Sequence, residues 1–193
     1  MRVIRFLLLL VLVCSGAAVR AEITISFYSK DFASSFPHAY VRLTGVDDQT
    51  GKAVDSNYGF TPWSVSPSIL FGPVRGFVET MDPLYVSRSD MHFSLKLTDE
   101  QYRQVLGIVE KWRKAPQPSY RLNTRNCVTF VAEVANSLGL NAPVIPKLMK
   151  KPKSYLNAVR DLNATQIAQW PGGPGIVQPV QLPTTQAAIV PAH

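Results

Sequence analysis

Two kinds of hydrophobic periodicity divide the chain, with strand patterns up to residue 97 and helix patterns after it. Alternation of apolar and polar residues, which predicts half-buried strands, occurs over residues 23–28, 38–44, 57–60 and 91–97. Apolar residues then recur at helical spacing over residues 98–112 and 126–138. Because the strands precede the helices, the sequence predicts an α+β fold with a small, mainly antiparallel sheet and helices packed on one side.

Both predicted helices begin at residues that cap helix starts well. Thr98 and Gln101 have the spacing of a capping box, and Asn126 is a favoured N-cap residue. Gly139 supplies the residue that commonly ends a helix in a left-handed conformation. The sequence therefore places one helix start at residue 98 and another at residue 126.

Residues 1–21 have the features of a secretory signal peptide. Arg2 and Arg5 precede a short apolar run over residues 6–13, and small residues follow near Ala21. The run is too short to span a bilayer. We expect cleavage near Ala21 and a periplasmic or secreted protein.

The positive charge of the chain does not indicate a nucleic-acid partner. The formal net charge is +7, and three of the arginines lie in the expected signal peptide. The remaining sequence has no glycine-rich phosphate loop, no cluster with metal-ligand spacing and no RNA-recognition signature. We therefore expect no nucleic acid, no metal and no cofactor.

The chain divides into four expected segments: a signal peptide over 1–21, an α+β domain over 22–140, a basic segment with a possible short helix over 141–169, and a Pro/Gly-rich tail over 170–193. The basic segment carries Lys147, Lys150, Lys151 and Lys153. These lysines form either a solvated loop or a contact with an anionic envelope surface. The tail is expected to be removable after residue 170 without unfolding the domain, or else to cover the active-site cleft.

Cys127 is the one cysteine left after removal of residues 1–21, because Cys14 leaves with them. It lies in the first turn of the helix that Asn126 caps, where backbone N–H groups and the helix dipole favour a thiolate. It also shares a helix stripe with Phe130 and Val131, which favours an inert buried thiol. Position alone leaves both interpretations open.

A reactive thiol needs a base, and three histidines are available. His38 begins a predicted strand, on the face that it shares with Tyr40 and Arg42. His92 lies on the polar side of a strand and is expected to be exposed, while His193 ends the tail. An imidazole on a strand that faces the start of a packed helix is the arrangement that activates cysteine hydrolases, so His38 is the preferred partner of Cys127.

The segment Asn126-Cys127-Val128-Thr129-Phe130-Val131 resembles the Asn-Cys-x-x-Phe-Val motif of the circularly permuted, NlpC-like branch of the papain-like superfamily. That branch includes lecithin–retinol acyltransferases and exported bacterial members. The segment 38–41 is similar to its histidine strand, and the runs 97–102 and 120–122 also fit. The resemblance covers about residues 23–140.

The resemblance implies a permuted papain-like fold in which Cys127 is the nucleophile and His38 the base. Asn57 is the nearest match to the third polar residue that orients the imidazole, and Asp55 competes with it. Thr129 stands where the acyltransferases carry a histidine, which disfavours retinoid or phospholipid acyl transfer.

The expected function is that of an exported cysteine hydrolase, either an amidase or peptidase or an acyl-ester hydrolase or acyltransferase. Its substrate would be an amide or ester, with a peptidoglycan peptide as the natural candidate for an exported bacterial protein. The alternative is a non-enzymatic binding or scaffold module of the cell envelope that keeps the fold.

Overall fold

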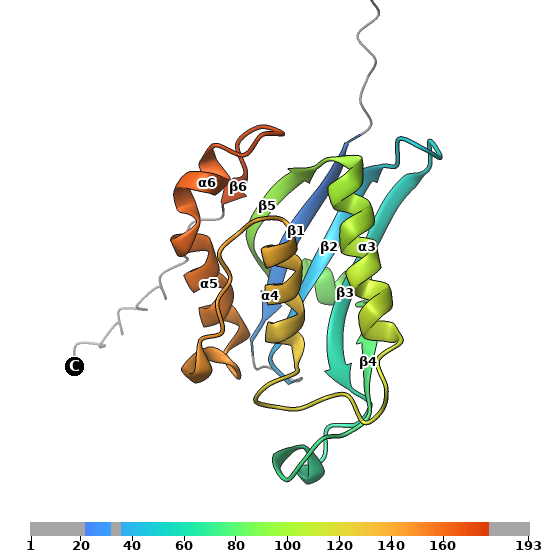
Figure 1. The fold of residues 1–193 in the computed structure, drawn as a ribbon, viewed down its shortest axis with the longest axis vertical. Coiled ribbons are helices and arrows are strands. Elements are labelled where there is room, and N and C mark those ends of the chain that lie inside the picture. The colour runs from blue at the N-terminus through green and yellow to red at the C-terminus, as the bar shows by residue number, and fades with distance from the viewer. Residues whose placement is uncertain (1–21, 32–35, 178–193) are drawn as a thin grey trace, which may run out of the picture.

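A computed structural model describes residues 22–31 and 36–177; the expected signal peptide, His193 and the rest of the segment 178–193 lie outside these residues. Within them, the strands form one six-stranded antiparallel sheet in the order β4-β3-β2-β1-β5-β6 (Figure 1). The strands are β1 (Ile23–Lys30), β2 (His38–Val46), β3 (Ala53–Pro62), β4 (Gly76–Glu79), β5 (Asp90–Leu97) and β6 (Ile176–Val177). The strands predicted from alternation are confirmed.

Three helices cover one face of the sheet: α3 (Asp99–Arg113), α4 (Cys127–Ser137) and α5 (Pro152–Leu162) (Figure 1). The short elements are α2 (Pro83–Ser87), α6 (Ala164–Ala168) and the 3-10 turns η1 (Pro67–Leu70) and η2 (Pro146–Leu148). The α+β class with its helices mainly on one side is therefore confirmed. Among the helices of the described residues, none combines the length and apolar character needed to cross a bilayer.

The main core lies between the sheet and α3, α4 and α5. Alternate residues of the two central strands point into it, including Phe27 of β1 and Val41 of β2, which are fully buried. Burial of each such side chain contributes about 1.5–3 kcal/mol. The apolar half of the alternating pattern therefore determines which face of the sheet the helices cover.

The opposite face of the sheet carries a smaller apolar cluster. Tyr40, Met81 and Val86 form its buried centre, and Tyr28 and Tyr85 pack against it. The rings of Tyr28 and Tyr40 stack with centroids 5.3 Å apart, as expected for neighbours on paired strands. This second cluster buries the side chains that alternate with the main core.

Both predicted helix caps are present. Thr98 and Gln101 form a reciprocal capping box at the start of α3. Asn126 caps α4, and Gly139 follows that helix with a φ of +84°, a conformation that glycine adopts at little cost.

The core does not end at residue 140, where the sequence suggested a domain boundary. Tyr155, Leu156 and Val159 of α5 are buried in the main core. The expected helix over 155–170 begins earlier, at Pro152, and divides at Asn163 into α5 and α6. The charged residues between the apolar positions weakened the periodic signal of this segment.

The Pro/Gly-rich segment also begins within the folded structure. The indole of Trp170 is 5% exposed and donates a hydrogen bond of 2.6 Å to the backbone oxygen of Lys96. Beyond it, β6 pairs with β5, and the N–H of Gly175 donates to the oxygen of Ile167. Residues 170–177 therefore belong to the domain.

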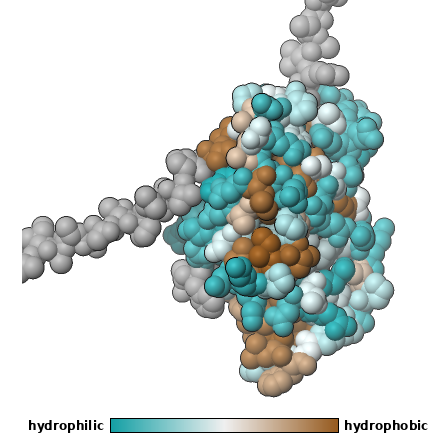
Figure 2. All heavy atoms as spheres, turned by 60° about the vertical axis from the view of Figure 1, so that its left-hand side comes forward, coloured by the Kyte–Doolittle hydropathy of each residue, from teal (hydrophilic) through white to brown (hydrophobic). Residues whose placement is uncertain are grey.

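Apolar side chains gather at the lower end of the molecule, at the loop that holds η1 (Figure 2). Leu70 and Phe71 are the most exposed large apolar residues there.

Trp170→Ala should lower the free energy of unfolding by about 3–5 kcal/mol, because it removes a buried aromatic ring and leaves a cavity. Urea unfolding of the purified domain measures this loss. Trp63→Ala is the matched control, since the Trp63 side chain is 61% exposed and should cost about 1 kcal/mol or less. Equal losses in the two variants would contradict the assignment of Trp170 to the core.

Candidate functional site

Cys127 begins α4 and lies against the central strand β2. The residue is 5% exposed and belongs to the main core, so its predicted position on the sheet-facing stripe is confirmed. Tyr120 lies close enough that a negative charge on the thiol would raise the pKa of its phenol, which burial already raises. The thiol therefore lies in an enclosed, largely apolar site.

Asn126 holds the start of α4 in place. Its side-chain oxygen accepts hydrogen bonds from the N–H groups of Val128 and Thr129, at 2.9 and 3.2 Å. Its amide nitrogen donates to the backbone oxygens of Leu122 and Met149, both at 2.7 Å. One buried side chain thus connects the helix start to the loop before it and to the segment that leads to α5.

Two opposing influences act on the Cys127 thiol. Burial raises its pKa to about 11, because the apolar surroundings disfavour the thiolate. The backbone N–H groups of Ala39, Val128 and Cys127 itself act in the other direction and lower the pKa. Burial is the larger effect, so the thiol is protonated at neutral pH in this conformation.

His38 is buried on the other face of the sheet. Its ring stacks on that of Tyr40, with centroids 6.2 Å apart. A Cβ added at Gly59 would overlap its Nε2 atom, so the imidazole lies directly over that glycine. The residue is 7% exposed, Nε2 has no hydrogen-bond partner, and burial lowers the pKa of His38 to about 4.

The structure does not bring the predicted catalytic side chains together. The Cys127 thiol lies on the α4 face beside Ala39, whereas the His38 imidazole lies with Tyr40 on the face away from α4. Asn57 shares the His38 face, but its amide bonds the backbone N–H and oxygen of Met81 at 2.6 and 3.0 Å.

Asp55, the competing candidate for the third residue, forms a bidentate ion pair with Arg42 at 2.9 Å. That pairing holds the pKa of the Asp55 carboxyl below its usual value. Its carboxylate is therefore engaged away from the imidazole.

His92 is not exposed, as its alternation had suggested, but 3% exposed on the helix-covered side. A β-bulge causes the difference: Phe27 pairs with Phe93 and Tyr28 pairs with Met91, so the pairing skips His92. The bulge turns His92 toward α5. Strict alternation along the strand would instead have placed His92 on the opposite face.

His92 connects two other polar side chains in a buried chain. Its Nε2 lies 2.7 Å from the Ser29 hydroxyl, and its Nδ1 lies 2.9 Å from the Asn157 side-chain oxygen. If Nδ1 carries the proton, it donates to the Asn157 oxygen, and Nε2 then accepts a hydrogen bond from the Ser29 hydroxyl. A nucleophile, its base and the residue that orients the base are hydrogen-bonded in the same sequence in catalytic triads. Sequence reasoning missed this chain because its members lie on three separate elements.

Among the described residues, His92 bonds Ser29 and Asn157 and makes no hydrogen bond to Cys127. Ser29 pairs with Ala39 across β1 and β2, so His92 on β5 lies two strands from the residue beside Cys127. Neighbouring strands are about 4.8 Å apart, which makes this separation about 10 Å. The chain of three residues therefore ties β1, β5 and α5 together beneath the thiol site.

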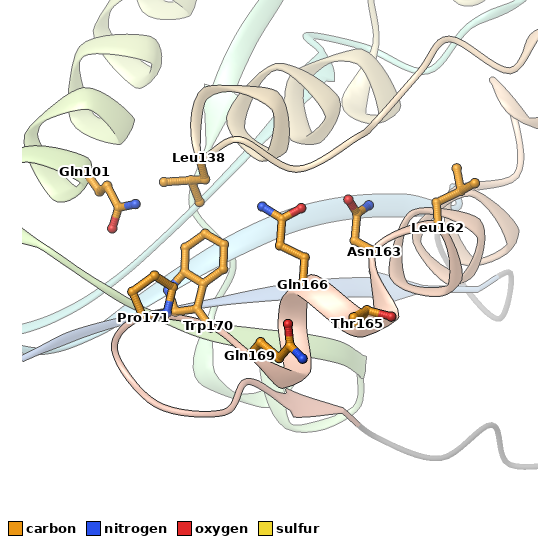
Figure 3. Close-up of a pocket in the computed structure, with 9 residues that line it drawn as sticks. All are labelled: Gln101, Leu138, Leu162, Asn163, Thr165, Gln166, Gln169, Trp170 and Pro171. Atoms are coloured by element: carbon orange, nitrogen blue, oxygen red, sulfur yellow. The ribbon is translucent and has the colours of Figure 1, made fainter.

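Two cavities differ in their relation to Cys127. The larger, about 570 Å³, lies at the far end of α4, where Leu138, Gln166 and Trp170 help to line it (Figure 3). The smaller, about 300 Å³, is lined by Pro37 and by residues around the start of α5. Pro37 directly precedes His38, so the smaller cavity lies where β2 begins.

Among the described residues, no group of three or more His, Cys, Asp and Glu side chains could hold a metal ion.

No protein-family model matches the chain, and no curated protein sequence matches it at a significant level. The crystal structure of the type VI secretion system effector TseH is similar to it, with a TM-score of 0.47 and 17% sequence identity. The match covers 74% of this chain and 90% of that chain. At this distance the likeness assigns neither a family nor an activity.

Acidification should destabilise the fold through His38. Because its pKa is lowered from 6.5 to about 4, the unfolded chain binds a proton that the folded chain does not bind between these pH values. Stability is therefore complete above pH 6.5 and falls as the pH decreases, by about 2 kcal/mol at pH 5. Urea unfolding at pH 7 and pH 5 should show a smaller loss for His38→Gln than for the unmodified chain. The same loss in both would mean that the imidazole is solvated.

Asn126→Ala should lower the free energy of unfolding by about 3 kcal/mol or more, because it removes a helix cap and leaves two buried backbone oxygens without donors. Asn141→Ala is the control, since the side chain of this exposed asparagine makes no described hydrogen bond. Denaturant unfolding of both variants gives the comparison. A loss below 1 kcal/mol for Asn126→Ala would contradict the role given to its amide.

Proposed function

We propose that the protein is an exported cysteine hydrolase or acyltransferase, with Cys127 as nucleophile and His38 as general base. The observation that carries the proposal is the position of the thiol: it lies beside the backbone N–H of Ala39, the residue that follows His38. The thiol, at the start of a capped helix, thus lies beside the residue that follows the base in β2. An amide or ester is the substrate class, and a peptidoglycan peptide is the natural candidate.

The proposed reaction uses the Cys127 thiol, the His38 imidazole and a backbone N–H at the start of α4. His38 takes the proton of the Cys127 thiol, and the sulfur attacks the carbonyl carbon. The backbone N–H of Cys127, at the start of α4, stabilises the oxyanion that forms. The imidazolium then gives its proton to the departing amine or alcohol. A water or an acceptor alcohol, deprotonated by His38, attacks the thioester and restores the thiol.

The described conformation is the resting state in this proposal. The thiol holds its proton and the imidazole is neutral, so neither side chain carries a charge in the core. Nε2 of His38 is buried without a partner, which is unfavourable by about 1–3 kcal/mol. For catalysis the imidazole leaves its position over Gly59 and turns around the start of β2 to the thiol.

Gly59→Ala tests this movement directly. The added Cβ would overlap Nε2 and Cε1 of His38 and approach Met81 Cε, so side chains rather than backbone must shift. The displaced imidazole should then lower the pKa of Cys127. We expect iodoacetamide to alkylate Cys127 about tenfold or more faster at pH 7, since each unit of pKa decrease raises the thiolate fraction tenfold. Mass spectrometry of the peptide that carries Cys127 measures the rate.

The increase must depend on His38. Adding His38→Ala to Gly59→Ala should return the rate to that of the unmodified chain. Gly107→Ala is the control, because a Cβ there meets no atom within 4 Å. A faster reaction that persists without His38 would reflect loosened packing instead, and would favour a non-enzymatic binding or scaffold module with an inert core thiol.

A further inference from the structure

We propose that the smaller cavity, at the start of α5, binds a carboxylate group of the acyl substrate. This inference rests on the proposed function and adds a substrate class to it. The residues that line the cavity are Asp31, Pro37, Lys150, Lys151, Pro152, Lys153 and Ser154.

The cavity adjoins both halves of the candidate site. Pro37, on one wall, directly precedes His38. Lys150, on the other, follows Met149, whose backbone oxygen accepts a hydrogen bond from Asn126 beside Cys127. The starts of α4, α5 and β2 lie together at the lower end of the molecule (Figure 1). A group held in the cavity therefore lies next to residues that flank the candidate site.

The cavity carries an excess of positive charge. Lys153 is already paired with Asp31 at 3.2 Å and with Asp90 at 2.9 Å. Within the part of the chain that the structure describes, Lys150 and Lys151 have no ion-pair partner. One carboxylate between these two ammonium groups would reduce the local charge without displacing an existing pair.

The uncapped start of α5 adds to the positive charge of the lysines. Lys151, the residue before α5, provides no side-chain cap to the helix. The positive end of α5 therefore adds to the field of the lysines instead of being neutralised by an acidic cap. A cavity of about 300 Å³ has room for a compact group such as a carboxylate and its nearest carbons.

Two alkylating reagents with the same reacting carbon test the site. Iodoacetate carries a carboxylate and iodoacetamide is neutral, so the ratio of their rates with Cys127 reports attraction of the carboxylate. The rates are measured at pH 9, where more of the thiol is ionised than at neutral pH. The same ratio in the urea-unfolded chain is the reference. We expect the ratio to be about threefold to tenfold higher in the folded chain, and to fall toward the reference in 0.5 M NaCl.

Lys150→Gln combined with Lys151→Gln should bring the folded ratio to the unfolded value. The control removes two lysines of the same charge outside the cavity, Lys114→Gln with Lys147→Gln, and should leave the ratio unchanged. An unchanged ratio in the first double variant, or an equal fall in both, would overturn the carboxylate site. The proposed function is tested separately, by the effect of His38→Ala on the rate of alkylation by iodoacetamide. The carboxylate site can therefore fail while the proposed function stands.

Discussion

The contact between the start of α4 and β2 determines where the Cys127 thiol lies and how deeply it is enclosed. The helix begins directly over Ala39, and the backbone N–H of that residue acts on the Cys127 sulfur. A methyl group is small enough to let the helix start approach the strand closely. The same approach encloses the thiol, which is why burial outweighs three N–H groups and raises the pKa of the thiol.

The sheet separates the thiol and the histidine side chains onto its two faces. The helix face holds Cys127 and the hydrogen-bonded residues Ser29, His92 and Asn157. The other face holds His38, whose ring stacks on that of Tyr40 in the smaller apolar cluster. Burial lowers the pKa of both imidazoles, so each histidine enters the folded state without charge. In this conformation the thiol and both imidazoles are neutral at neutral pH, and the thiol and the His38 imidazole lie on opposite faces of the sheet.

Much of this arrangement was present in the sequence. Alternation located the strands, and the caps at Thr98 and Asn126 located two helix starts. The same alternation placed His38 with Tyr40, opposite the apolar residues that attract the helices. The expectation that its imidazole faces the helix start conflicted with that placement, and the structure keeps His38 with Tyr40. The bulge that turns His92 inward could not be predicted from the sequence, because a skipped residue depends on how two strands distant in the sequence pair.

The end of the domain was missed for a related reason. A basic, proline-containing segment has the composition of a linker, yet α5 places Tyr155, Leu156 and Val159 in the core. Burial of these side chains fixes the helix against β1 and β5, and the helix start then fixes where its lysines project. Met149, bonded to Asn126, sets that start beside the start of α4. The positions of these lysines at the start of α5 are therefore a consequence of the same packing that completes the core.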